Sequence, residues 1–318
     1  MDKTLDFLAI GDITNDAFIR LKDAAVHCDI KHEHCQLCVD FGAKIPYEFV
    51  EVVRAVGNSA NAAVSAARLG VSSGLISNIG DDASGRECIE ELRHNNVATE
   101  FVHAERGKKT NYHYVLWYEE ERTILVKHED FHYKLPEFPA PKWLYLSSLS
   151  DHSLPYHDEI GEYVEKHKEV KLAFQPGTFQ MKLGLERLHK IYENAEIFFC
   201  NKQEAEQILQ FKSDDIKELL LRMQKRGPRL VIITDGPKGA YAYDGGKTLF
   251  VPPYPDPKPP YERTGAGDAF ASTITAALAL GEPLEKALLW GPINSMSVVQ
   301  HIGAQKGLLS HTELKDLL

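Results

Sequence analysis

Short apolar runs alternate with helix-like stretches along most of this chain, and this alternation limits the folds open to it. Residues 5–11 (LDFLAIG) and 71–80 (VSSGLISNIG) are apolar runs that end in glycine, a pattern typical of strands buried on both faces. Residues 57–69 are rich in alanine, and Gly70 follows them, which predicts a helix with glycine just past its end. Strands that alternate with helices form a parallel sheet covered by helices on both faces. We therefore predict an α/β fold.

The alternation continues to the end of the chain, with two exceptions. Residues 17–45 are irregular, and residues 111–130 are aromatic and β-branched with Glu120 and Glu121 between two strand-like halves, which predicts a hairpin. We expect these two excursions to pair into a small second sheet. The remaining predicted strands are 143–148, 171–175, 196–200 and 229–234, and the remaining predicted helices are 81–95, 155–168, 202–211, 213–226, 266–280 and 284–300.

Charge and hydropathy exclude two classes of function. The chain has 36 basic and 46 acidic residues and a formal net charge of −10, which repels a nucleic-acid backbone. Its longest mostly apolar stretch, 269–280, is shorter than the ~20 residues that span a membrane. The acidic N-terminus lacks the features of a signal peptide. We therefore expect no nucleic-acid or membrane partner and a cytoplasmic location.

Cysteines and histidines crowd together once. A C-x-x-C spacing within this segment is also found in zinc sites, but no second pair follows at the spacing of a zinc finger. Five cysteines are an odd and sparse set for a chain of 318 residues, so we expect reduced thiols, no disulfide framework and no zinc. The crowded residues are His27, Cys28, His32, His34, Cys35 and Cys38.

One segment carries recognisable chemistry. Residues 264–281 form a glycine-rich loop that leads directly into an apolar helix. Gly265 and Gly267 allow backbone N–H groups to converge, and the start of a helix adds partial positive charge, so the loop suits phosphate oxygens. A carboxylate at Asp268 is placed to accept a proton from a hydroxyl beside that phosphate. The alternative is that Asp268 only caps the helix.

Four stretches in the same order resemble the ribokinase (PfkB) family of carbohydrate kinases. The resemblance reaches from near the N-terminus to the last large helix and implies a three-layer α/β/α domain over residues 1–318. It also implies a β-sheet lid over the substrate, for which the excursions at 17–45 and 111–130 are the candidates. The four stretches are GNSANAAVSAARLG (57–70), NKQE (201–204), VIITDGPKG (231–239) and TGAGD (264–268).

The resemblance also implies roles for individual residues. Asp268 would be the catalytic base, and Gly265, Ala266 and Gly267 the anion hole for the transferred phosphoryl group. Asn201 and Glu204 would organise Mg²⁺, through water; the alternative is that Asn201 caps a helix beside a solvated Glu204. The implied nucleotide contacts are Thr234, Gly236, Gly239, Thr264, Asn294 and Gly303, and the implied substrate contacts are Thr14, Asp16, Gly57, Asn58 and Asn61.

Two positions depart from the family pattern. Val56 stands where a glycine that assists lid hinging is usual. Arg263 stands before Thr264, where an acidic residue that helps to bind a monovalent cation is common. Potassium activation is therefore in doubt.

We expect a kinase that transfers the γ-phosphoryl group of Mg·ATP to a hydroxyl of a small sugar. A nucleoside kinase is the alternative within the family, favoured by the lid aromatics at 112–118. A sugar-phosphate kinase would need a cation near neutral Asn58, and a silent nucleotide- or sugar-binding protein would not need Asp268. Apolar positions on a β-sheet lid also suggest a homodimer through the lid.

Overall fold

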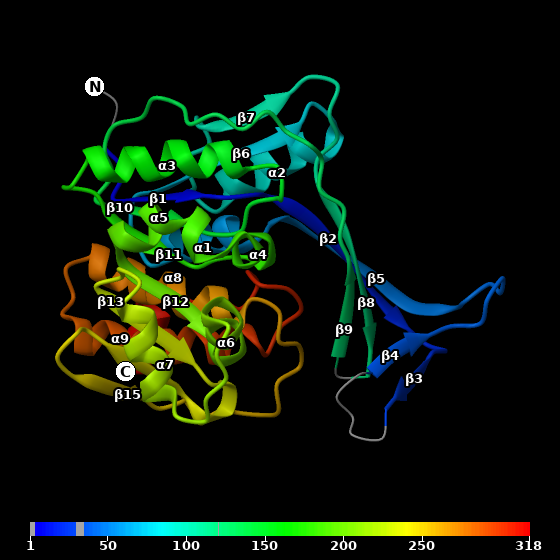
Figure 1. The fold of residues 1–318 in the computed structure, drawn as a ribbon. Helices are drawn as coiled ribbons and strands as arrows, with labels where there is room; N and C mark the ends of the chain where they lie inside the picture. Colours follow the sequence, from blue (N-terminus) through cyan, green and yellow to red (C-terminus); the bar gives the residue numbers. More distant parts are fainter. Residues whose placement is uncertain (1–3, 30–34, 120) are drawn as a thin grey trace.

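The structure, a computed structural model, describes residues 4–29, 35–119 and 121–318. It consists of a large layered domain and a lid that extends from one side of it (Figure 1). No described helix is both long enough and apolar enough to cross a membrane.

The described residues of the large domain contain a nine-stranded sheet in the order β15-β14-β13-β12-β11-β10-β1-β6-β7. All of its strands run in the same direction except β14, which is antiparallel to both of its neighbours, β13 and β15. Because β1 is apolar and buried along its whole length, helices are able to cover it on both faces. The strands are β1 (Phe7–Ile10), β6 (Ser73–Gly80), β7 (Val102–Glu105), β10 (Trp143–Leu146), β11 (Lys171–Phe174), β12 (Ala195–Asn201), β13 (Leu230–Thr234), β14 (Ala240–Tyr243) and β15 (Thr248–Val251).

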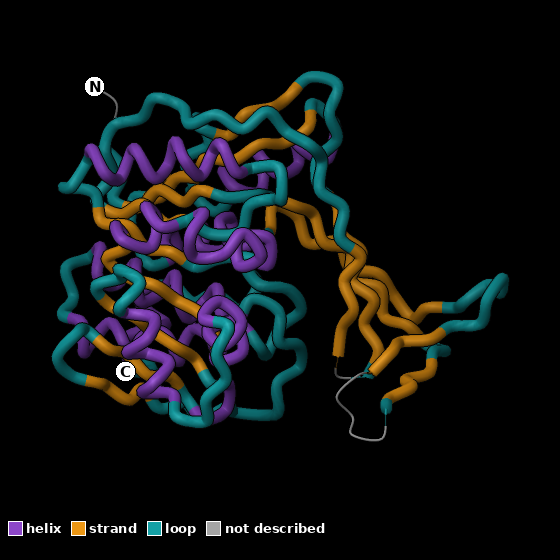
Figure 2. The backbone as a smooth tube through the Cα atoms, viewed as in Figure 1, coloured by secondary structure: helices purple, strands orange, loops and turns teal. Residues whose placement is uncertain are grey.

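Helices lie in two layers, one on each face of this sheet (Figure 2). One layer packs around Trp290 and holds α1 (Asn58–Arg68), α2 (Ala83–His94), α8 (Ala266–Ala279), α9 (Leu284–Val298) and α10 (His311–Lys315). The other packs around Tyr192 and holds α3 (Leu154–Lys166), α4 (Thr178–Arg187), α5 (His189–Asn194), α6 (Lys202–Leu209) and α7 (Ile216–Gln224). This confirms the predicted three-layer α/β fold.

The lid is a four-stranded sheet in the order β5-β2-β8-β9. Its strands are β2 (Thr14–Leu21), β5 (Tyr47–Val56), β8 (Tyr112–Tyr118) and β9 (Glu121–Leu125). The first excursion therefore runs from Thr14 to Val56 and is largely strand, whereas the sequence predicted an irregular segment over 17–45. The signal in β5 is weak, because its exposed and half-buried residues alternate without a fully polar face.

A hairpin extends the lid, and it corrects the expectation of reduced thiols. Strands β3 (Ala25–Cys28) and β4 (Cys35–Cys38) pair so that Cys28 lies directly opposite Cys35, and these two form a disulfide. Cys38, Cys88 and Cys200 are free. His32 and His34 of the crowded segment lie outside the described residues. Among the residues that the structure describes, no three His, Cys, Asp or Glu side chains gather in a way that could hold a metal ion.

Candidate active site

Asp268 lies in the first turn of α8, and three side-chain amides hold its carboxylate. Asn58 and Asn61 from α1 each donate to it at 2.8 Å, and Gln175, which follows β11, donates at 3.1 Å. The Tyr145 hydroxyl donates to the side-chain oxygen of Gln175, so the Gln175 amide nitrogen is left facing Asp268. Burial raises the pKa of Asp268, and the three amides partly oppose that shift. A buried carboxylate of raised pKa suits a general base.

The predicted anion-hole residues, Gly265, Ala266 and Gly267, lie at the start of α8. Gly265 is the N-cap residue at φ 81°, and a Cβ atom there would lie 2.2 Å from the Cβ of Ala304. Glycine is therefore required both by the backbone conformation and by this close approach. Ala266 and Gly267 open the helix, where backbone N–H groups lack partners within the helix and can donate to an anion. The Ala266 amide donates at 3.4 Å to the Arg263 carbonyl oxygen, which precedes the helix.

The buried carboxylate of Glu262 holds the loop that precedes α8 through hydrogen bonds. Glu262 accepts hydrogen bonds from the Thr264 amide at 2.7 Å and from the Thr264 hydroxyl, and the Gly303 amide donates to its other oxygen at 3.4 Å. The Arg122 guanidinium of the lid lies 3.2 Å from it. The acidic residue of this chain is thus Glu262, one position before Arg263, and the Arg263 side chain is exposed. The sequence analysis missed Glu262, although an acid two residues before the T-G-A-G-D loop was a visible signal.

Glu262 does not fit a monovalent cation. One of its oxygens accepts two hydrogen bonds from Thr264 and faces a guanidinium, and the other faces the Gly303 amide. Its negative charge is already balanced by the charge of Arg122. The structure therefore gives a different reason to doubt potassium activation from the one that Arg263 suggested.

Two adjoining cavities open beside the anion hole. One, of about 290 Å³, is lined by Thr234, Gly236 and Gly239 among others, together with proline-rich segment 252–260 and residues of α9. The other, of about 620 Å³, is lined by Asn201, Glu204, Thr234, Gly236 and Gly267. Both also include Arg263. The structure thus brings three of the six predicted nucleotide contacts, together with Asn201 and Glu204, to one region at the carboxyl ends of β12 and β13, where open α/β sheets bind ligands.

Asn201 and Glu204 form a capping box at the start of α6. The Glu204 backbone N–H donates to Asn201 Oδ1, and the Asn201 backbone N–H donates to Glu204 Oε2, both at 2.8 Å. Burial raises the pKa of Glu204, and the negative charge of Asp268 adds to the rise. A divalent cation in this cavity would relieve that unfavourable charge, and carboxylate and amide oxygens are ligands that Mg²⁺ accepts. Capping and metal binding are thus compatible here.

Three predicted nucleotide contacts do not line these cavities: Thr264, which donates to Glu262, and also Asn294 and Gly303. Asn294 is fully buried, donates to the Thr273 hydroxyl at 2.7 Å and accepts from the Leu309 amide at 2.9 Å. Gly303 lies under the lid, where an added Cβ would meet Val53 at 3.1 Å. Asn294 has a structural role, and its neighbours Ser295 and Met296 face the smaller cavity instead.

The predicted acceptor residues lie where the lid joins β1. Asp16 is buried on β2 with Oδ1 3.3 Å from His113 Nδ1, and that oxygen has no hydrogen bond. Thr14 is also buried, and its hydroxyl donates to the Asn15 carbonyl at 3.3 Å. Gly57, at φ 110°, packs so tightly that a Cβ would lie 2.6 Å from the Asp12 carbonyl oxygen. Asn58 and Asn61, also predicted as substrate contacts, donate to the Asp268 carboxylate.

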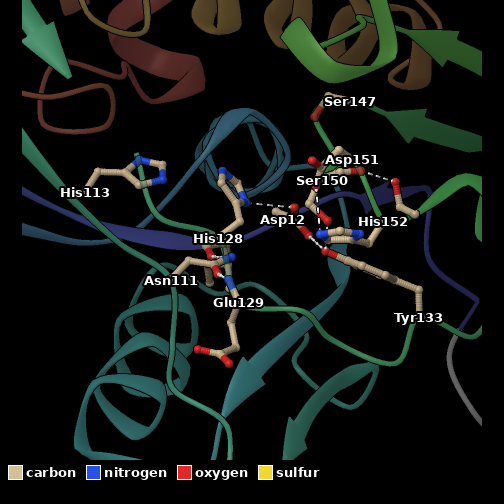
Figure 3. Close-up of polar contacts among 12 residues, drawn as sticks. Asp12, Asn111, His113, His128, Glu129, Tyr133, Ser147, Ser150, Asp151 and His152 are labelled. Carbon is tan, nitrogen blue, oxygen red and sulfur yellow. Dashed lines mark hydrogen bonds and ion pairs between the residues drawn. The ribbon is translucent and has the colours of Figure 1, made fainter. Parts of the chain in front are cut away.

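A second carboxylate–imidazole pair, Asp12 with His128, lies beside the pair of Asp16 and His113. Asp12 Oδ2 is 3.3 Å from His128 Nδ1 but makes no hydrogen bond, and Asp12 Oδ1 accepts from the Tyr133 hydroxyl at 2.8 Å (Figure 3). The rings of His113 and His128 are 5.2 Å apart. The sequence analysis assigned no role to Asp12, His113 or His128, because residues 100 positions apart give no local pattern.

Comparison with known proteins decides the family. The model of the pfkB family of carbohydrate kinases matches residues 39–311. The chain belongs to that family. Ribokinase of Bacillus subtilis is 28% identical over 82% of this chain and 87% of its own, and cytidine kinase of Thermococcus kodakarensis is 31% identical over 78% and 88%. The structure of Arabidopsis thaliana ribokinase complexed with ribose and ATP matches with a TM-score of 0.82 at 17% identity, covering 99% of both chains, and shows the common fold. The protein is therefore a phosphotransferase with an alcohol acceptor.

We predict that Asp268→Asn abolishes most turnover and leaves ATP binding largely intact. An amide accepts no proton at neutral pH, and a general base typically contributes about 10²–10⁴-fold in rate. Coupled ADP detection measures turnover, and calorimetric titration with ATP measures binding. Turnover of the variant within a factor of two of the original enzyme would remove Asp268 as the base.

A second prediction concerns pH. Because burial raises the pKa of Asp268, we expect kcat/KM to fall with acidification at a higher pH than the ~3.9 of an ordinary aspartate. The Gln175 amide stabilises the ionised carboxylate, so Gln175→Met raises the pKa further and moves the acid limb of the pH–rate profile upward. Gln207→Met, an exposed position on α6, is the control and leaves the limb in place. A downward shift in Gln175→Met would contradict this electrostatic account.

Proposed function

We propose that this kinase transfers the γ-phosphoryl group of ATP to a hydroxyl of a small sugar. One observation carries the proposal: the buried carboxylate of Asp268 lies in the first turn of α8, beside the glycine-lined loop. There Asp268 accepts the proton of the acceptor hydroxyl, and the amides of residues 265–267 stabilise charge on the transferred group.

Asn201 and Glu204 are the residues that we propose hold Mg²⁺, through water. The cation would balance the charge of the ATP phosphates in the larger cavity. Asn201 keeps the Glu204 carboxylate in place through the capping box. Thr234, Gly236 and Gly239 line the smaller cavity, and we propose that this cavity takes the nucleoside part of ATP.

The acceptor side favours a molecule with several hydroxyls. Asp12 Oδ2, Asp16 Oδ1 and His113 Nε2 are buried without hydrogen-bond partners. Buried polar atoms of this kind are costly unless a ligand satisfies them. A sugar supplies hydroxyls that both donate and accept, whereas two carboxylates repel a phosphorylated sugar.

A nucleoside is the second candidate for the acceptor. Its support is the 31% identity to a cytidine kinase and an aromatic ring, Phe179, whose centroid lies 5.9 Å from that of His128. Such a ring offers a surface for a base, while Asp16 remains available to the ribose hydroxyls.

We also propose that the enzyme is cytoplasmic, where ATP is abundant, and that it forms a homodimer through the lid. The strand register places Val50, Val52, Tyr114 and Leu125 on the lid face opposite Asp16, and all four are exposed. A contiguous apolar sheet face of this kind is typical of an interface.

For the dimer, we expect light scattering to give twice the chain mass, and Val50→Asp to give a monomer because a carboxylate in the interface is desolvated. Leu221→Asp, at an exposed apolar position on α7, is the control and leaves the dimer intact. A monomeric original protein would refute the lid interface.

For the substrate, we expect ADP release with neutral pentoses or hexoses in a panel that also contains nucleosides and sugar phosphates. Asp16→Asn should raise the KM for the accepted compound by roughly 10- to 100-fold, the loss expected of a hydrogen bond to a charged group. The exposed Asp23 of the same lid segment provides the control, Asp23→Asn, with unchanged KM. Activity on sugar phosphates alone would overturn the proposal.

A further inference from the structure

The lid touches the segment before the anion hole at two adjacent residues. Arg122 of β9 lies 3.2 Å from Glu262, and the Trp117 ring of β8 meets the Tyr261 ring edge-on with centroids 5.2 Å apart. Trp117 and Arg122 are opposite each other in the strand register, so their side chains share one face of the lid. The lid and the segment before the anion-hole loop, more than 130 positions apart in the sequence, are thus in contact.

Glu262 depends on this contact for its charge balance. Its side chain is only 3% exposed, and a buried carboxylate without a cationic partner is strongly unfavourable. Arg122 is its only ion-pair partner within the part of the chain that the structure describes. When the guanidinium withdraws, Glu262 must take up water, a proton or another cation, and each of these loosens its hold on Thr264.

Thr264 carries the effect to the anion hole. Both its amide and its hydroxyl donate to Glu262, and it immediately precedes the Gly265 turn that aims the amides of residues 265–267. The charge of Arg122 also acts on Asp268, whose pKa it lowers. Anion hole and base therefore both respond to one lid side chain.

We propose that Arg122 is a positioning residue. By pairing with Glu262, Arg122 orders the anion-hole loop, residues 264–267, only while the lid rests on that loop. The guanidinium also supplies the positive charge that a monovalent cation would otherwise bring. The chain of contacts is Arg122 to Glu262 to Thr264. The consequence for catalysis rests on the proposed phosphoryl transfer, whereas the ordering of the loop does not.

Kinetics of matched lid variants provide the first test. We expect Arg122→Met to lower kcat at least tenfold with the acceptor KM changed less than threefold, and Arg122→Lys to recover part of the loss. Arg54→Met is the control, because Arg54 also joins the lid to the large domain, through Glu87 at 2.7 Å on α2, and it should change neither constant more than twofold. An acceptor KM that rises in Arg122→Met while kcat stays constant would mean that Arg122 binds substrate directly, which overturns the proposal.

Added ions provide the second test. Guanidinium chloride far below denaturing concentration should restore part of the turnover of Arg122→Met and none in Arg54→Met, since it can fill the vacated place beside Glu262. The original enzyme should work equally well in sodium and potassium salts. A potassium requirement in the original enzyme would contradict the replacement of the cation by Arg122.

Hydrogen exchange of the ligand-free protein separates this proposal from the proposed function. Amides of residues 261–267 should exchange faster in Arg122→Met than in the original protein or in Arg54→Met. If they do and no substrate is turned over by the original protein, the positioning role stands and the proposed function fails. Unchanged exchange in Arg122→Met overturns the positioning role, whatever the activity.

Discussion

The carboxylate of Asp268 is the group around which the candidate site is built. An ionised carboxylate in a protein interior is stable only when hydrogen bonds replace its water. Here the donors are Asn58, Asn61 and Gln175, which come from α1 and from the end of β11. These elements must therefore be held in place before Asp268 has its full set of donors, and the parallel sheet between the helix layers holds them. The geometry of the base is a consequence of the whole α/β/α domain.

Sequence patterns predicted the large domain well because its strands and helices differ in composition. Buried parallel strands such as β1 and β10 are short and wholly apolar, and α8 is apolar behind a glycine-rich loop. In the lid, the β8–β9 hairpin was predicted from its aromatic and β-branched residues, whereas the strands of the first excursion were not. In β5 both faces mix apolar and charged residues, so neither alternation nor a continuous apolar run marks it.

In the candidate site, too, some residues could be predicted from local sequence and others could not. The T-G-A-G-D loop could be singled out from the sequence because the glycine-rich turn and Asp268 are adjacent in the chain. The contacts of that loop could not be predicted because they join distant parts of the chain. Asn58 and Asn61 donate to Asp268, and Glu262 pairs with a lid arginine 140 positions away. A family resemblance transfers residue types to positions, but the direction in which a side chain points is decided by packing.

Charge balance connects these features. The chain carries a net charge of −10, and its site gathers the carboxylates of Asp12, Asp16, Glu204, Glu262 and Asp268, yet a kinase must hold a polyanionic nucleotide beside them. The start of α8 supplies only partial positive charge. Arg263 and Lys238 line the larger cavity and supply positive charge from the large domain. Arg122 of the lid adds a guanidinium at Glu262, and a divalent cation near Glu204 would add more. Because either carboxylate is unfavourable without its cation, assembly of the site and binding of its substrates should be coupled, and a nucleotide without metal should bind weakly.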